Sequence, residues 1–132
     1  MWALVIVAIA LALAPAAAAP AAARPCGSDP RVIGPCFPVH GRLHYFNGNP
    51  SLRLWRVGTS RYLGIHDDED PLVPGNLAAC LRGFERTVYG DFVFCPFTRN
   101  RAGWMQMGCI ESARNLVVQD EGGAARRCDS AH

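Results

Sequence analysis

Apolar and polar residues alternate most clearly between positions 39 and 57. Two runs rich in β-forming residues, 39–46 and 51–57, flank the segment Asn47-Gly48-Asn49-Pro50. Asn-Gly between alternating runs is a strong hairpin signal, because both residues tolerate the positive φ that such a turn requires. The pattern therefore predicts two antiparallel strands joined by a tight turn.

The register of this hairpin depends on the length of its loop. A two-residue loop pairs Leu43 with Leu52, and a four-residue loop pairs Leu43 with Leu54. Because side chains alternate between the faces of a strand, both registers give the same two faces. The inner, apolar face consists of Gly41, Leu43, Tyr45, Leu52 and Leu54. The outer face consists of His40, Arg42, His44, Arg53 and Trp55, with Phe46 at its tip.

The outer face of the hairpin is basic and aromatic, and Arg and Trp are enriched among the residues that dominate binding interfaces. We interpret it as a binding surface for a protein or another envelope component. The alternative is that a second sheet or a proline-rich arm covers Trp55, since large aromatic side chains are mostly buried.

The rest of the chain predicts a mainly β fold with one short helix. Strands are expected at 61–65, 89–97, 104–111 and 115–119, and the acidic residues 67–70 read as a solvated turn. Asn76 is a candidate cap for a helix that carries Leu77, Cys80, Leu81 and Phe84 and stops at Gly83. We expect a small antiparallel β-sandwich with one short helix, stapled by disulfides.

The first 23 residues contain no charged side chain and include an apolar run from Leu4 to Leu13. This pattern is typical of a cleavable signal peptide, and an uncleaved membrane anchor is the alternative. We expect residues 24–38 to form a Pro/Gly-rich arm, residues 39–119 a single β domain and residues 120–132 a polar tail. The protein is then secreted or periplasmic, with no membrane span after cleavage.

Six cysteines in a chain of 132 residues fit an oxidising compartment. They allow fifteen pairings, and spacing alone does not choose among them. A turn centred near Ala102 places Cys95 opposite Cys109, which makes this the preferred bridge. The cysteines are Cys26, Cys36, Cys80, Cys95, Cys109 and Cys128.

Charge and motif content limit the chemistry. A net charge of +2 is too small to imply a nucleic-acid partner. Ser60 has no nucleophile elbow around it and the four histidines are scattered, so we predict neither enzymatic activity nor a cofactor. Met105, Met107 and Cys109 alternate on one strand and offer soft ligands for copper(I). In the competing interpretation the methionines fill gaps in the core and Cys109 is oxidised.

The hairpin sequence VHGRL, NGNP and SLRLW (residues 39–43, 47–50 and 51–55) is similar to the opening hairpin of transthyretin-like and carboxypeptidase-regulatory-like domains. Residues 90–94 (GDFVF) resemble a later strand of those domains, and the resemblance implies a β-sandwich. The segments 90–97 and 105–118 are similar to small exported proteins of proteobacteria, a group that implies no activity.

These observations favour an exported, non-catalytic binding or envelope-associated module. A periplasmic copper-binding protein is one alternative. A small secreted hydrolase or enzyme inhibitor is the other.

Overall fold

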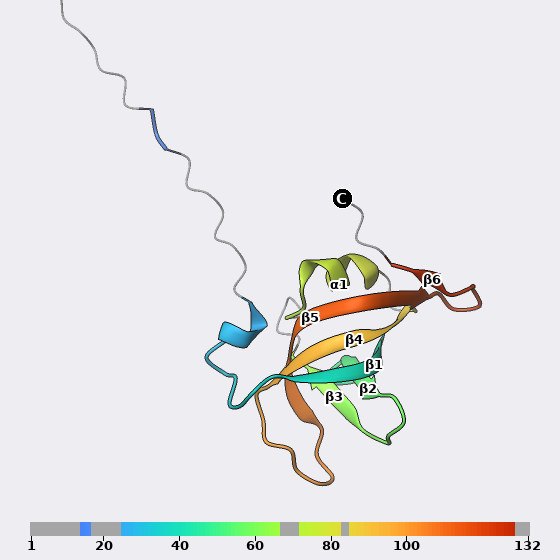
Figure 1. Cartoon of the computed structure of the whole chain (residues 1–132), viewed down its shortest axis with the longest axis horizontal. Coiled ribbons are helices and arrows are strands. Elements are labelled where there is room, and N and C mark those ends of the chain that lie inside the picture. Colours follow the sequence, from blue (N-terminus) through green and yellow to red (C-terminus); the bar gives the residue numbers. More distant parts are fainter. Residues whose placement is uncertain (1–13, 17–24, 67–71, 83–84, 129–132) are drawn as a thin grey trace, which may run out of the picture.

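A computed structural model describes residues 14–16, 25–66, 72–82 and 85–128. Figure 1 shows a curved sheet with one α-helix above it and an amino-terminal arm at its side. The elements in chain order are η1 (Cys26–Ser28), β1 (Phe37–Tyr45), β2 (Leu52–Arg56), β3 (Tyr62–Ile65), α1 (Gly75–Cys80), β4 (Thr87–Pro96), β5 (Gln106–Gln119) and β6 (Arg126–Arg127).

The sheet closes on itself as a five-stranded barrel. Its strand order is β3-β2-β1-β4-β5-β6, and β3 also pairs with β5 in parallel. The closing contact is short and joins residues 63–65 to residues 106–108. The expectation of a β-sandwich is therefore wrong. Alternation along each strand is the same in a barrel and a sandwich, and the pairing that closes this barrel is between residues far apart in the sequence.

The inner face of the β1–β2 hairpin forms part of the core, as the alternation predicts. Leu43, Leu52 and Leu54 are fully buried, Gly41 is buried and Tyr45 packs against the core from its edge. Leu43 pairs with Leu54, so the four-residue loop is the one observed. Phe92 and Phe94 of β4 fill the barrel from the other side.

The predicted strands at 104–111 and 115–119 are one continuous strand, β5. Two register shifts opposite β4 interrupt its pattern, and Asn115 adopts a positive φ of 54° at one of them. A bulge inserts an extra residue and bends the strand without ending it. This bend lets a single long strand pair with both β4 and β3.

The helix lies where the sequence predicts it, but Asn76 does not cap it. The cap position is Pro74, and the side-chain amide of Asn76 donates a hydrogen bond of 2.8 Å to the carbonyl oxygen of Ala113 in β5. Leu77 and Cys80 point into the core. Gly83, Phe84 and the acidic turn at 67–70 lie outside the described residues.

All six cysteines form disulfides: Cys26–Cys109, Cys36–Cys95 and Cys80–Cys128. Cys95 and Cys109 are cross-strand partners, as expected, but they are not bonded to each other. Each is joined instead to the amino-terminal arm, so the preferred bridge is wrong although the register that suggested it is right. Three disulfides indicate an oxidising environment outside the cytosol.

The polar tail is attached to the barrel by strand pairing as well as by the disulfide of Cys128. β6 pairs with β5 through Val117–Arg127 and Val118–Arg126. The expected signal peptide falls largely outside the described residues, and among those residues no helix is long and apolar enough to cross a membrane.

Candidate binding site

The outer surface of β1, β2 and β3 brings Arg42, Trp55 and Tyr62 together. Arg42 is the cross-strand partner of Trp55, and Trp55 is the partner of Tyr62. The Arg42 guanidinium carbon lies 4.7 Å from the centroid of the Trp55 ring, and Nη2 of Arg42 donates a hydrogen bond of 3.4 Å to the Tyr62 hydroxyl. Stacking on a ring and bonding to a hydroxyl hold this cation in one orientation.

A second stack lies beside the first. The guanidinium carbon of Arg53 lies 5.1 Å from the centroid of the Phe46 ring, and its Nε donates to the carbonyl oxygen of Pro50 at 2.9 Å. Phe46 also contacts His44 and Tyr62 edge-on, with centroids 5.2 and 5.7 Å apart. We call this surface the basic–aromatic face; it consists of Arg42, His44, Phe46, Arg53, Trp55 and Tyr62.

The strands of the basic–aromatic face supply arginine without an acid, although His44 also lines a pocket with Glu85, Asp120 and Glu121. β1, β2 and β3 contain no Asp or Glu. Within the described parts of the chain, neither Arg42 nor Arg53 forms an ion pair with a carboxylate. Their partners are aromatic rings, a hydroxyl and a backbone carbonyl, none of which neutralises a guanidinium.

Four of the five residues predicted for the outer face meet here, and His40 does not. His40 Nδ1 lies 2.8 Å from Oδ1 of Asp91 on the neighbouring strand β4. Hydrogen bonds from Asn115 and from His40 hold the pKa of Asp91 below its ordinary value. Trp55 is only partly exposed, and Arg42 covers its ring. The Nε1–H of Trp55 donates a hydrogen bond of 2.7 Å to the carbonyl oxygen of Thr59.

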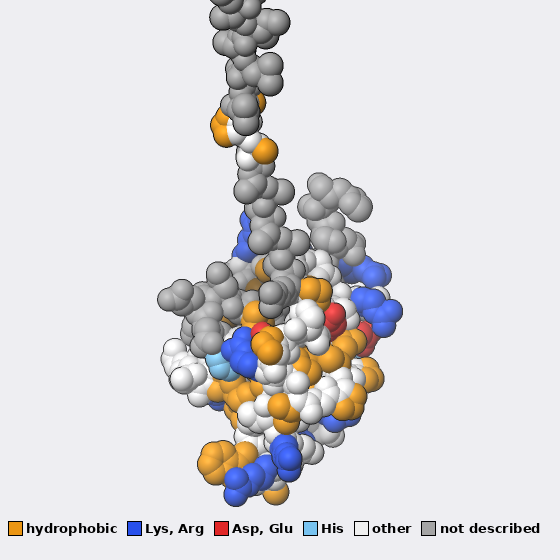
Figure 2. Space-filling model, turned by 90° about the vertical axis from the view of Figure 1, so that its left-hand side faces the viewer, with side chains coloured by type: hydrophobic (Ala, Val, Ile, Leu, Met, Phe, Trp, Pro, Cys, Tyr) orange, Lys and Arg blue, Asp and Glu red, His pale blue; other side chains and the backbone are white. Residues whose placement is uncertain are grey.

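A shallow groove of about 430 Å³ continues the surface beyond Tyr62. Arg101 stacks on Trp104 at 5.1 Å, and the Trp104 side chain is 66% exposed. Arg61 donates a hydrogen bond to the side chain of Asn100 and so links the β2–β3 loop to the β4–β5 loop. In Figure 2 the lower tip, where Figure 1 places the β4–β5 loop, carries arginine and hydrophobic side chains together. We call this the loop groove; it is lined by Ser60, Arg61, Tyr62, Arg101, Ala102, Gly103, Trp104 and Met105.

The residues of the loop groove were not predicted from the sequence. Arg101 and Trp104 stand on either side of the turn at Ala102 and Gly103, so an arginine and a tryptophan flanking a turn were a usable local signal. Tyr62 joins the loop groove to the basic–aromatic face because the barrel closes and brings the start of β3 beside the start of β5. The sequence gives no local sign of this closure.

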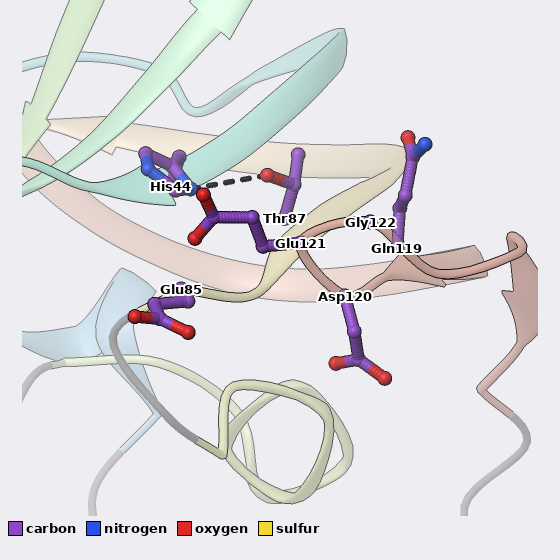
Figure 3. A pocket seen from close by; sticks show the side chains of 7 residues that line it. All are labelled: His44, Glu85, Thr87, Gln119, Asp120, Glu121 and Gly122. Carbon is purple, nitrogen blue, oxygen red and sulfur yellow. Dashed lines mark hydrogen bonds between the residues drawn. The ribbon is translucent and has the colours of Figure 1, made fainter.

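A second pocket, of about 360 Å³, lies at the other end of the barrel and is lined by His44, Glu85, Thr87, Gln119, Asp120, Glu121 and Gly122. Figure 3 shows His44 bonded to Thr87, with Glu85, Asp120 and Glu121 on the surrounding loops. The same ring nitrogen of His44 meets the Thr87 hydroxyl at 3.0 Å and the Arg86 carbonyl oxygen at 3.3 Å. In nucleophilic catalysis a histidine base uses one ring nitrogen for the nucleophile and the other for the group that orients the ring. Both contacts of His44 fall on the same nitrogen, so they do not form such an arrangement.

The ligand set of the copper alternative is incomplete in the oxidised protein. Cys109 is bonded to Cys26 and offers no thiolate. Met105 and Met107 place their sulfur atoms over Gly64, where a side chain would collide with both. The thioethers therefore pack over the backbone of β3, and both side chains are half-buried and lie outside the core.

No family model, curated protein or solved structure matches this chain.

Proposed function

We propose that the protein is an exported, non-catalytic binding module, and that its basic–aromatic face and loop groove bind an acidic polysaccharide of the cell envelope. The observation that carries the proposal is the pair of guanidiniums, Arg42 and Arg53, stacked on aromatic rings and paired with no carboxylate among the described residues.

The chemistry of the stacked arginines fits an anionic ligand. A guanidinium is planar, and its fork of N–H groups matches the two oxygens of a carboxylate. Arg42 and Arg53 each commit one nitrogen to an oxygen of the protein and retain others for a ligand. Because the side chains are already held in place, binding costs less conformational entropy than it would with mobile ones.

The shape of the surface fits a chain of rings better than a compact molecule. The loop groove is shallow, and Tyr62 and Trp104 line it with flat aromatic rings on which the apolar face of a sugar can pack. Small five-stranded barrels of the OB type bind oligosaccharides and oligonucleotides on the surface of strands 2 and 3. That precedent concerns architecture alone and assigns no function by itself.

A polysaccharide is favoured over a nucleic acid by the small number of cations on the basic–aromatic face. Nucleic-acid binding draws its affinity from many neutralised phosphates. The face presents two stacked arginines, Arg42 and Arg53, which is few for a ligand bound in that way. Export by a cleavable signal peptide, which the leader predicts, would place the protein where envelope polysaccharides occur.

The test is calorimetric titration of the oxidised protein with a uronic-acid oligomer, with a neutral oligomer of the same length and with single-stranded DNA. We expect the uronic-acid oligomer to bind and the neutral one not to. The variant Arg42→Gln should weaken binding about tenfold, as expected for loss of a charge-assisted hydrogen bond. Arg114→Gln, which removes an exposed arginine on β5, is the matched control. Equal binding of neutral and acidic oligomers, or tighter binding of DNA, would overturn the proposed ligand.

A further inference from the structure

The amino-terminal arm is held by two disulfides that enter the barrel side by side. Cys26 is bonded to Cys109 of β5, and Cys36 is bonded to Cys95 of β4. Cys95 and Cys109 are directly paired across the two strands. The sulfur atoms of Cys26, Cys95 and Cys109 all lie within 4.8 Å of one another, in a buried cluster.

We infer that these two bonds form an exchange relay, in which reduction of the outer bond by a dithiol releases both attachments of the arm. The evidence is the sulfur cluster itself, which places a third sulfur beside an existing bond. The inference is independent of what the basic–aromatic face binds.

The relay starts at Cys36, which is exposed, whereas Cys26, Cys95 and Cys109 are buried. A thiolate of the dithiol attacks the sulfur of Cys36, and Cys95 leaves as a thiolate. The second thiol of the reductant then displaces Cys36, which leaves as a free thiol. At this stage the reductant is oxidised to its own disulfide and the Cys36–Cys95 bond has been reduced by two electrons.

The second step is an internal exchange. The Cys95 thiolate attacks the sulfur of Cys109, the Cys95–Cys109 bond forms, the Cys26–Cys109 bond breaks, and Cys26 leaves as a thiolate that takes up a proton. Paired positions on antiparallel strands lie within disulfide reach. No further electrons are consumed, so one equivalent of dithiol yields two free thiols, both on the arm.

The direction of the exchange follows from chain entropy. The β4–β5 ladder already holds Cys95 and Cys109 opposite each other, so a bond between them costs no further conformational entropy. Releasing Cys26 restores conformational freedom to the arm. The contacts that remain include the bond from the Gly27 amide to Oε2 of Glu111, at 2.5 Å, the bond from the Ile33 amide to the Pro96 carbonyl oxygen, at 2.9 Å, and the stack of Arg31 on Phe97.

The experiment is a reductive titration of the wild-type protein with dithiothreitol, sampled when half of Cys36 is alkylated. Acid quenching, alkylation and mass mapping of unreduced peptides give the fate of each cysteine. The relay predicts Cys26 alkylated to the same extent as Cys36, together with a peptide pair linked through Cys95 and Cys109. Alkylated Cys95 with an intact Cys26–Cys109 bond would overturn it. So would a Cys26–Cys95 bond with Cys109 alkylated.

The variant Cys36→Ser tests the second step without a reductant. Cys95 then has no partner on the arm, and the relay predicts a Cys95–Cys109 bond with Cys26 alkylated. The matched control is Cys80→Ser, because the Cys80–Cys128 bond lies outside the sulfur cluster; it should leave both arm bonds in place. An alkylated Cys95 in the folded Cys36→Ser protein contradicts the relay. If this variant does not fold, the wild-type titration decides alone.

Discussion

Two surfaces of the same barrel use arginine in opposite ways. On the β4–β6 side, Asp120 accepts hydrogen bonds from Arg86 at 2.7 Å and from Arg126 at 2.6 Å, so both guanidiniums share one carboxylate. On the basic–aromatic face, Arg42 and Arg53 lie on aromatic rings and meet no carboxylate among the described residues. The first arrangement holds the tail against the barrel, and the second leaves cationic groups oriented for a ligand.

The difference shows what a net charge conceals. A total of +2 averages a paired region with an unpaired one. Local complementarity depends on which charges are already satisfied, so it can be strong where the average is weak. Substitutions on each surface test whether the two surfaces differ in function as they do in pairing.

The largest effect is expected from a residue beneath both surfaces. Leu54 is fully buried in the barrel, next in sequence to Trp55 on the outside. Leu54→Ala should lower the free energy of unfolding by about 2–5 kcal/mol, because it leaves a cavity in the shared core. Denaturant unfolding measures this. A cost below ~1 kcal/mol would contradict the barrel core described here.

Trp55→Ala removes the platform under Arg42. We expect affinity for the acidic oligomer to fall by ~2 kcal/mol, about 30-fold, while the three disulfides still form. Calorimetry together with a free-thiol count measures both. Unchanged affinity with a lower melting temperature would mean that Trp55 only supports the fold.

Arg42→Lys keeps the charge and loses the planar, two-pronged donor. Affinity should fall about tenfold, and Arg114→Lys on β5 should change it by less than about twofold. The same titration compares the two variants. Equal effects at both positions would show that the two surfaces are not distinct and that affinity depends on net charge alone.

The smallest effect is expected from Asp120→Asn, which breaks the paired surface. Hydrogen bonds from Arg126 and Arg86 lower the pKa of Asp120 from its ordinary value of 3.8. This stabilisation is fully present above that pH and is lost as the pH falls through the lowered pKa of the folded state. The variant should therefore melt slightly below wild type at pH 7, and the difference should vanish at acidic pH, with ligand binding unaffected. Thermal melts across this pH range test the sign, and a difference that grows on acidification would contradict it.

How far the sequence predicts this molecule depends on how local each feature is. The β1–β2 hairpin and its two faces follow from alternation and one turn, and both are read within about twenty consecutive residues. Closure through three residues of β3 and β5 has no local signature, so a sandwich was expected where a barrel forms. The arm has no periodicity from which the partners of Cys26 and Cys36 could be assigned.

The residues of the binding surface likewise fall into those that local sequence predicts and those that long-range pairing brings in. Alternation identified Arg42, His44, Arg53 and Trp55, because β1 and β2 are neighbours in the chain. Tyr62 joins them through pairing with β2, and Trp104 through closure of the barrel. His40 shares the alternation with Arg42 but lies beside Asp91, an acid on a strand whose position the hairpin does not reveal.

The most direct test is a nuclear magnetic resonance titration of the oxidised protein with the uronic-acid oligomer, observed at the arginine Nε–H and tryptophan Nε1–H groups. We expect progressive shifts for Arg42, Arg53, Trp55 and Trp104, with the resonances of Arg86 and Arg126 unchanged. Shifts confined to Arg86 and Arg126, or spread evenly over all the arginines, would contradict it.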